Sequence, residues 1–160
     1  MKSIIKVSAT LGPTVRQVIH EYLLDKLEAM EDGGAPVWTR VYPTELDGAD
    51  NMVTPCVGID YGEEVRLDSY GGCSIYELPV FFPFRFTPQY GVDEQALFQY
   101  YLGLLQHHIL SDYNLSKNAQ SIEDVGNVHS IVGLEGVYPG GTWLTKVIYK
   151  TRLRQPHKLI

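Results

Sequence analysis

The first strong pattern along the chain is the spacing of an amphipathic helix. Apolar side chains recur at intervals of three and four residues over positions 15–27, and charged side chains occupy the opposite side. Thr14 and Gln17 have the spacing of a capping box, in which a hydroxyl and an amide each satisfy a free backbone group at a helix start. A glycine pair at 33–34 interrupts the pattern. The sequence therefore predicts a helix that follows a loose, irregular leader, residues 1–12, and ends before the glycine pair.

Apolar runs bounded by turn residues follow this helix and predict three strands. These runs cover residues 36–42, 54–60 and 73–86. The charged stretch 61–69 either extends the second strand or forms a hairpin arm. The third run carries Pro79 and Pro83 on one side, and proline has no backbone N–H to donate to a sheet ladder. Part of this third strand is therefore expected at a sheet edge or at a bend.

The second half of the chain predicts a helix followed by a hairpin. Asp93 is a suitable cap for a helix that continues to about Leu110. Its apolar side chains leave almost no polar side, so we expect its own sheet and a neighbouring subunit to bury it. Residues 111–127 are polar and predict a connection. Two strands, at 128–138 and 142–154, then flank a proline–glycine turn.

This order of elements predicts a single α+β domain over residues 1–160. We expect an antiparallel or mixed sheet of about four to five strands, with two helices packed on one face. The C-terminal tail, residues 155–160, is expected to be loose. The chain has 160 residues, of which 44% are hydrophobic and 20% are charged, so it can bury a core of its own.

The last predicted strand separates charged side chains from apolar ones, because side chains alternate across a strand. One side carries Lys146, Ile148, Lys150, Arg152 and Arg154, and the other carries Thr145, Val147, Tyr149, Thr151 and Leu153. The apolar side can pack on the core of the protein. The charged side must meet water, an acidic partner surface or nucleic acid.

The charge of the whole chain is distributed just as unevenly. Residues 1–140 contain 19 acidic and eight basic residues, and residues 141–160 contain five basic residues and no acidic one, which gives a net charge of −6. A general nucleic-acid binder would usually be basic. Three interpretations of the basic side stay open. It is a solvated edge protected from aggregation, a subunit interface against acidic stretches at 45–50 and 60–68, or a contact to phosphates without sequence preference.

Candidate chemistry is sparse. Two cysteines, Cys56 and Cys73, leave a cysteine nucleophile as one alternative, and a backbone nest at Gly71-Gly72 would favour a thiolate at Cys73. The five histidines lack metal-ligand spacing, and no phosphate-binding glycine motif is present. We therefore predict that the protein is not an enzyme and holds no cofactor and no metal.

Hydropathy gives no sign of a membrane segment or an export signal. No apolar run approaches the roughly 18 residues that span a bilayer. The start of the chain lacks the apolar stretch of a secretion signal. We expect a soluble protein made inside a cell, with both thiols reduced and no membrane partner.

Several strings occur in an order that is informative as a set. They are a helix (PTVRQVIHEYLLDKLEAM), a strand (PVWTRVYP), a charged stretch (GIDYGEEVRLDSYGG), a strand (CSIYELPVFFPFRF), a second helix and a glycine-turn hairpin (EGVYPGGTWLTKVIYKTR). This arrangement, over roughly residues 12–154, resembles the tail terminator proteins of long-tailed bacteriophages. The similarity lies in the order of the elements and in the general character of these sequence segments. Pro79 and Pro83 depart from the family pattern.

The resemblance implies a structural virion protein without catalysis. Six copies would form a homo-hexameric ring on the last ring of the tail tube, stop tube polymerisation and offer the opposite face to the head connector. DNA would pass through the lumen without sequence-specific binding, and the overall acidity suits such a channel. The protein would assemble in the host cytoplasm and belong to the tail or neck of the virion.

A ring of identical subunits needs one surface that fits a different surface of the next copy. We expect the basic side of the last strand to meet the acidic stretch of a neighbour. The predicted interface residues are Lys146, Lys150, Arg152 and Arg154 against Glu63, Glu64 and Asp68. The alternatives are another phage neck protein (a stopper or head–tail connector), a small intracellular enzyme with a cysteine nucleophile, and a monomeric module that binds an acidic partner.

Overall fold

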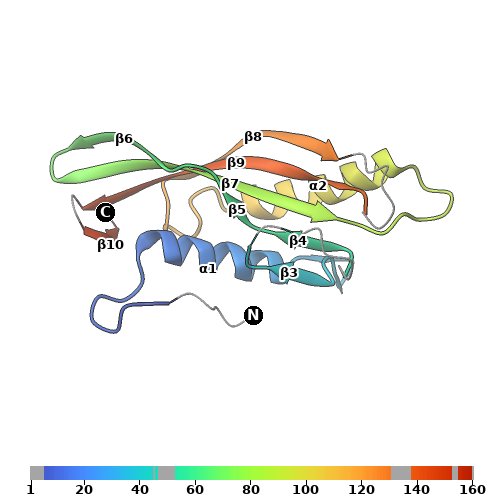
Figure 1. Ribbon diagram of the computed structural model, residues 1–160, viewed down its shortest axis with the longest axis horizontal. Coiled ribbons are helices and arrows are strands. Elements are labelled where there is room, and N and C mark those ends of the chain that lie inside the picture. Colours follow the sequence, from blue (N-terminus) through green and yellow to red (C-terminus); the bar gives the residue numbers. More distant parts are fainter. Residues whose placement is uncertain (1–5, 45, 47–52, 131–137, 153–154, 160) are drawn as a thin grey trace.

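The computed structural model describes residues 6–44, 46, 53–130, 138–152 and 155–159. Along these residues the elements are α1 (Val15–Glu28), β1 (Glu31–Asp32), β2 (Ala35–Pro36), β3 (Arg40–Tyr42), β4 (Cys56–Gly58), β5 (Asp60–Tyr61), β6 (Val65–Tyr70), β7 (Cys73–Arg85), α2 (Glu94–Leu110), β8 (Ser121–Ser130), β9 (Gly140–Arg152) and β10 (Gln155–Leu159). β7 and β9 run along the length of an elongated molecule (Figure 1). The architecture is α+β, as predicted.

Local chemistry fixes the start of α1 as predicted. The Thr14 hydroxyl accepts the Gln17 N–H at 3.1 Å, and the Gln17 side-chain oxygen accepts the Thr14 N–H at 2.8 Å. This capping box satisfies two backbone donors that the first turn of a helix cannot pair. β1 and β2 then form a short hairpin around Gly33 and Gly34, whose φ angles of 60° and 84° suit glycine.

The second helix also lies where the sequence predicts it. Asp93 caps α2, and its carboxylate accepts the Gln95 N–H at 3.4 Å. The side of α2 that is buried in the core consists of Leu97, Phe98, Tyr101, Leu102, Leu105 and Ile109. Tyr100 on the other side is 44% exposed, and its hydroxyl donates to Asp32 of β1. Burial of α2 by a neighbouring subunit stays a prediction.

The centre of the sheet is the antiparallel pair of β7 and β9. Each strand has 13 residues, and the register joins Cys73 to Arg152 at one end and Arg85 to Gly140 at the other. Three short strands, β4, β5 and β6, pair with the far edge of β7, and β8 and β10 pair with the far edge of β9. β3 adds to β4 in parallel. Within the described residues the sheet has eight strands, so the expected number of four to five was wrong. The short strands beside β7 and β9 were not predicted because their sequence is polar.

β7 lies inside the sheet, so its expected position at an edge or bend was also wrong. The Pro79 carbonyl accepts the Gly62 N–H at 3.1 Å, and in an antiparallel strand a residue's N–H and carbonyl face the same neighbour. The missing N–H of Pro79 therefore faces the break between β5 and β6. Pro83 has the same orientation and faces the break between β4 and β5. Both prolines therefore lie where the strands beside β7 are interrupted.

Three boundaries differ from the prediction at the C-terminal end. β9 begins at Gly140, inside the predicted proline–glycine turn. β8 begins at Ser121, inside the predicted polar connection, and pairs antiparallel with β9. Of the predicted strand 128–138, residues 131–137 lie outside the described residues. β10 occupies the tail that was expected to be loose, and Gln155 pairs with Arg152. Pairing with β9 decides β8 and β10, because their own composition is not typical of strands.

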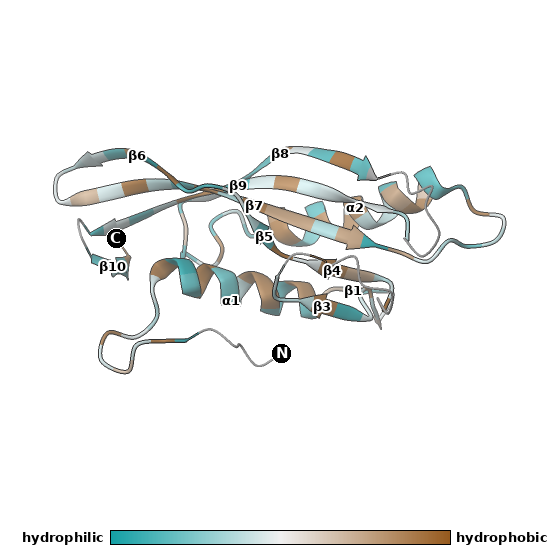
Figure 2. Ribbon diagram, viewed as in Figure 1, coloured by the Kyte–Doolittle hydropathy of each residue, from teal (hydrophilic) through white to brown (hydrophobic). Residues whose placement is uncertain are grey.

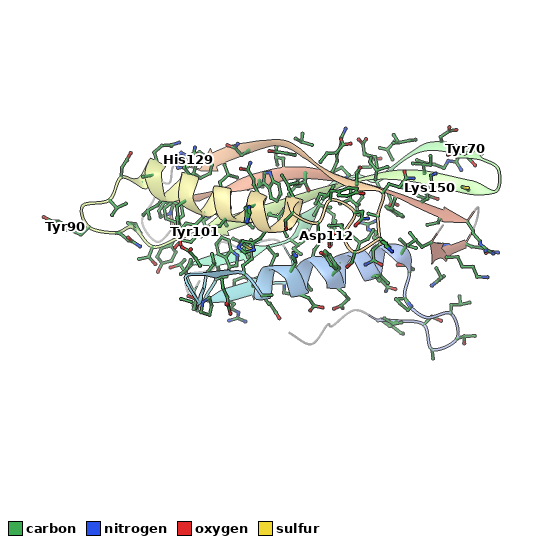
Figure 3. The ribbon with its side chains drawn as sticks, turned by 180° about the vertical axis from the view of Figure 1, so that it is seen from behind. Tyr70, Tyr90, Tyr101, Asp112, His129 and Lys150 are labelled. Carbon is green, nitrogen blue, oxygen red and sulfur yellow. The ribbon has the colours of Figure 1, made fainter. Side chains whose placement is uncertain are left out.

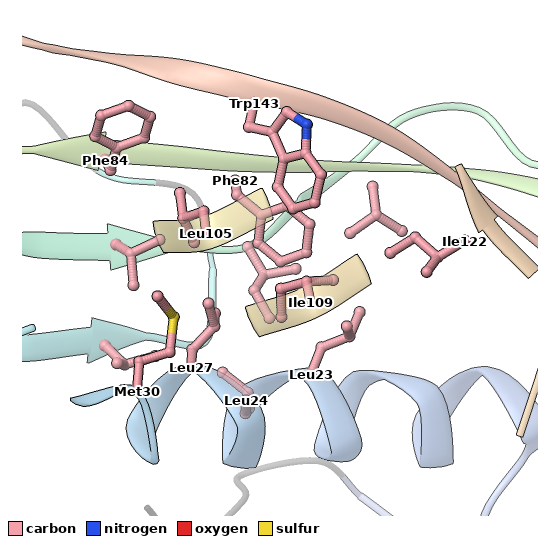
Figure 4. Packing of buried hydrophobic residues seen from close by; sticks show 14 of the residues in the cluster. Leu23, Leu24, Leu27, Met30, Phe82, Phe84, Leu105, Ile109, Ile122 and Trp143 are labelled. Carbon is pink, nitrogen blue, oxygen red and sulfur yellow. The ribbon is translucent and has the colours of Figure 1, made fainter. Parts of the chain in front are cut away.

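Side chains of the long pair alternate between a buried inner face and a half-exposed one. The buried residues of the inner face are Ser74, Leu78, Val80, Phe82 and Phe84 of β7, and Trp143, Thr145, Val147, Tyr149 and Thr151 of β9. Phe84 stacks on Phe98 of α2, and Phe82 and Trp143 point towards both helices (Figure 4). Both helices thus pack on one face of the sheet. Figure 2 shows much of β7 as hydrophobic and much of β8 as hydrophilic.

Candidate assembly surface

The opposite face of β7 and β9 is covered by neither helix, and we call it the outer face. Its side chains are Cys73, Ile75, Glu77, Pro79, Phe81, Pro83 and Arg85 of β7 and Thr142, Leu144, Lys146, Ile148, Lys150 and Arg152 of β9. All are half-buried except Arg152, which is exposed. Apolar side chains gather near Phe81 and Leu144, and charged ones gather near Lys150 and Arg152. A surface that combines the two is suited to contact with another protein.

Lys146 lies near the middle of the outer face and has partners in its own chain. Its ammonium nitrogen is 3.2 Å from a Glu77 carboxylate oxygen and 3.3 Å from a Glu123 carboxylate oxygen. Hydrogen bonds to Glu77 and Glu123 raise the pKa of Lys146. This predicted interface residue therefore belongs to an ion cluster within one subunit, and a carboxylate from a neighbouring copy would have to compete with that cluster.

The other predicted basic residues are more available. The Lys150 nitrogen lies 5.7 Å from the centroid of the Tyr70 ring, which is a cation–π distance. Figure 3 shows the two side chains together near one end of the molecule. Arg152 is exposed at the end of β9, and Arg154 lies outside the described residues.

The predicted acidic partners do not form one surface. Asp68 is exposed on β6, and its register places it on the outer face, one strand removed from Lys150. Glu64 points to the inner face, where its carboxylate accepts the Tyr149 hydroxyl. Glu63 is exposed between β5 and β6. The outer face therefore has mixed charge and is not purely basic.

The predicted pairing between subunits stays a prediction. Asp68 and Lys150 lie on the same face of a single copy. If Lys150 of one copy paired with Asp68 of another, the contact would bring the same face of the two copies partly together. The second acidic stretch proposed for this interface, 45–50, lies outside the described residues except for position 46.

A second polar site, not expected from the sequence, lies where α1 meets β5. The His20 Nδ1 hydrogen-bonds with the Tyr61 hydroxyl, and the Arg16 guanidinium lies 5.3 Å from the Tyr61 ring centroid. With Thr14 and Gln17 these residues line a hollow of about 310 Å³. Burial lowers the pKa of His20 and raises the pKa of Tyr61. The i, i+4 spacing of Arg16 and His20 was the one sequence signal of this site.

The surroundings of the two cysteines give little support to the alternative of an enzyme with a cysteine nucleophile. Cys56 is fully buried in β4, and burial raises its pKa to about 11. The Cys73 thiol donates a weak hydrogen bond to the Gly71 carbonyl oxygen at 3.8 Å. Cys56 pairs with Arg85 and Cys73 begins β7, so the length of that strand, about 40 Å, separates them. A disulfide within the chain is therefore excluded.

Two unexpected features lie at opposite ends of the molecule. Tyr90, in the loop between β7 and α2, is fully exposed and projects from one end (Figure 3). Leu11 and residues 155–158 line a hollow of about 440 Å³ at the other end. The sequence signal for Tyr90 was an aromatic residue inside a turn-forming Pro88–Gly91 segment, and the hollow had no sequence signal.

Among the described residues, no group of three or more His, Cys, Asp or Glu side chains is placed to hold a metal ion. Neither described helix combines the length and the apolarity needed to cross a bilayer.

Comparison with models of known protein families found no match, and a search of curated proteins found none either. The function is therefore inferred from the surfaces of the chain and from the resemblance of its sequence to tail terminator proteins.

Proposed function

We propose that the protein is a structural component of a phage virion that forms a ring on the end of the tail tube. The observation that carries the proposal is the outer face, a two-strand surface that neither helix covers and that combines apolar side chains with ion pairs. Half-exposed apolar residues beside charged ones support a protein partner on this face. The resemblance to tail terminator proteins supplies the kind of assembly.

Capping requires no chemical step. One face of a six-membered ring binds the last ring of tail-tube protein and blocks the surface on which the next tube ring would polymerise. The opposite face of the ring binds the head connector. Each chain carries a net charge of −6, so the ring is acidic, and an acidic channel lets DNA pass without tight phosphate contacts.

Electron microscopy of the purified protein, alone and with polymerising tail-tube protein of the same phage, tests this function. We expect six-membered rings, and tubes that stop growing and carry one ring at an end. Light scattering should give a mass of six times 18.0 kDa, and the mass should fall at high salt if ion pairs join the subunits.

Two outcomes would contradict capping. Tubes that grow unhindered and carry no ring would rule it out. Binding to the head connector without binding to the tube would indicate another neck protein in its place.

A further inference from the structure

We propose that Tyr90 of one copy inserts into the hollow beside Leu11 and β10 of the next copy. The contact rests on the proposed ring function and deepens it, because it names one junction between neighbouring subunits. The occupant of the hollow is therefore a second copy of this chain.

A defined turn places Tyr90 at a position that is fully exposed to solvent. The Val92 N–H donates to the Gln89 carbonyl at 3.1 Å, and Gly91 has a φ of 77°, the pattern of a type II turn with Tyr90 at its tip. The Tyr90 side chain is 107% exposed, so its own subunit gives it no packing. Tyrosine is one of the residues that dominate protein interfaces, and a turn that already fixes its backbone loses little backbone freedom on binding.

The hollow at the other end has fixed walls. Leu11, which is 64% exposed, forms one wall, and residues 155–158 of β10 form the other. The Gly12 N–H closes the turn around Leu11 by donating to the Ser8 carbonyl at 3.0 Å. The His157 Nδ1 lies 3.1 Å from the Gly12 carbonyl and ties this turn to β10. The volume of about 440 Å³ lies in the range of pockets that enclose small ligands, so a phenol ring fits.

The short segments that would meet in this contact carry charges of opposite sign. Residues 86–95 contain Asp93 and Glu94 and no basic residue. The segments that build the hollow, 6–13 and 155–159, contain two lysines and no acidic residue. Attraction between unlike ends therefore favours the approach of Tyr90 to the hollow over the approach of two like ends.

One copy cannot make this contact with itself. Tyr90 follows the Arg85 end of β7, whereas β10 pairs with Arg152, which is opposite Cys73 at the far end. The strand separates these ends by about 40 Å. Figure 1 shows the loop after β7 and β10 at opposite ends of the long axis. A contact between two different ends is heterologous, so it closes into a ring or continues as a filament.

Disulfide cross-linking between two differently marked proteins tests the contact. One protein carries Gln89→Cys beside Tyr90, and the other carries Gln155→Cys at the rim of the hollow. Both carry Cys73→Ser, and Cys56 stays because it is fully buried. We expect oxidation of the mixture to give a covalent dimer with one copy of each, at a higher yield than dimers of either protein alone. Both cysteines in one chain should give a ladder of longer multimers.

Two tyrosine variants control the cross-link. Tyr90→Ala in the Gln89→Cys protein should lower the yield of mixed dimer about tenfold, as expected when an aromatic anchor is truncated. Tyr113→Ala is the matched control and should leave the yield unchanged, because Tyr113 is 64% exposed but lies in the connection after α2.

The outcomes separate this contact from the ring function. The absence of a mixed dimer, or a mixed dimer that forms equally well with Tyr90→Ala, would overturn the contact. Rings on tubes without a mixed dimer would overturn it and leave capping intact. A mixed dimer that depends on Tyr90, together with tubes that are never capped, would support the contact and contradict the proposed function.

Discussion

The two faces of the β7–β9 pair differ although they share one backbone. Phe81 and Phe82 are neighbours and are chemically identical, yet Phe82 is fully buried under the helices and Phe81 is half-buried on the outer face. Every large side chain of the inner face packs into the core, whereas the outer face mixes apolar residues with ion pairs. The inner face therefore supplies the stability of the fold, and the outer face is available for contacts with other proteins.

Replacing each phenylalanine by alanine is the strongest test of this difference. Phe82→Ala should lower the free energy of unfolding by about 3–5 kcal/mol, because it leaves a cavity beside the stacked ring of Trp143. Phe81→Ala should lower it by only about 1 kcal/mol, since part of that ring is already in water. Urea denaturation followed by tryptophan fluorescence measures both. Equal losses would contradict the assignment of the two faces.

Adding one methyl group gives the next largest effect. A Cβ at Gly141 would lie 2.4 Å from a Phe98 ring carbon and 2.5 Å from the Val128 carbonyl oxygen, so Gly141→Ala should cost about 1–3 kcal/mol of stability. Gly103 is exposed in α2, and a Cβ there meets nothing within 4 Å. Gly103→Ala should therefore stabilise the protein by about 0.5–1 kcal/mol. Thermal denaturation compares them, and a loss at Gly103→Ala would mean that this side of α2 is packed.

Charge reversal on the outer face should change stability less. Lys146→Glu brings three carboxylates together, so it should lower the melting temperature, and more strongly at low salt. Lys150→Glu should change the melting temperature less, because Lys150 contacts the exposed ring of Tyr70, but it should weaken assembly if the predicted subunit pairing holds. Calorimetry and light scattering at two salt concentrations separate the two effects. Adding Glu123→Lys to Lys146→Glu should restore the melting temperature, and failure to do so would argue against the ion cluster.

The smallest expected effect on stability concerns His20 of α1, the helix that packs on the inner face. Burial, aided by Arg16 and opposed by Glu21, holds the pKa of His20 below its ordinary value of 6.5. The unfolded chain then binds a proton more readily than the folded one, so this contribution to stability is complete above pH 6.5 and declines as the pH falls towards the folded pKa. His20→Gln should flatten this decline in denaturation experiments between about pH 7 and pH 5. An equally steep decline in His20→Gln would assign it to other groups.

The sequence was sufficient where neighbouring residues decide the structure. The capping box of Thr14 and Gln17 involves a single turn of chain, and its prediction is confirmed. The alternation of β9 is equally local, and it correctly separated the buried Val147 and Tyr149 from Lys146 and Lys150. Both features depend only on spacing along the chain.

The sequence was not sufficient where distant partners decide the structure. β8 begins early because Glu123 contacts Lys146, and because Asp124 accepts the Trp143 indole N–H at 3.0 Å. β10 contains Pro156, which argues against a strand until β9 provides an edge for it. The same limit applied to the candidate surface. Alternation showed that Lys146 faces outward, but not that two carboxylates of its own chain already hold it.

The register of β7 with β9 joins residues that lie far apart along the chain. Paired residues lie between 55 and 79 positions apart, since Arg85 meets Gly140 and Cys73 meets Arg152. Loops of this length make such pairing slow to form. During synthesis β7 leaves the ribosome before β9, so the apolar side of β7 waits for its partner strand. The central pair of the sheet therefore cannot form until β9 has been synthesised, so the core of the fold is completed late.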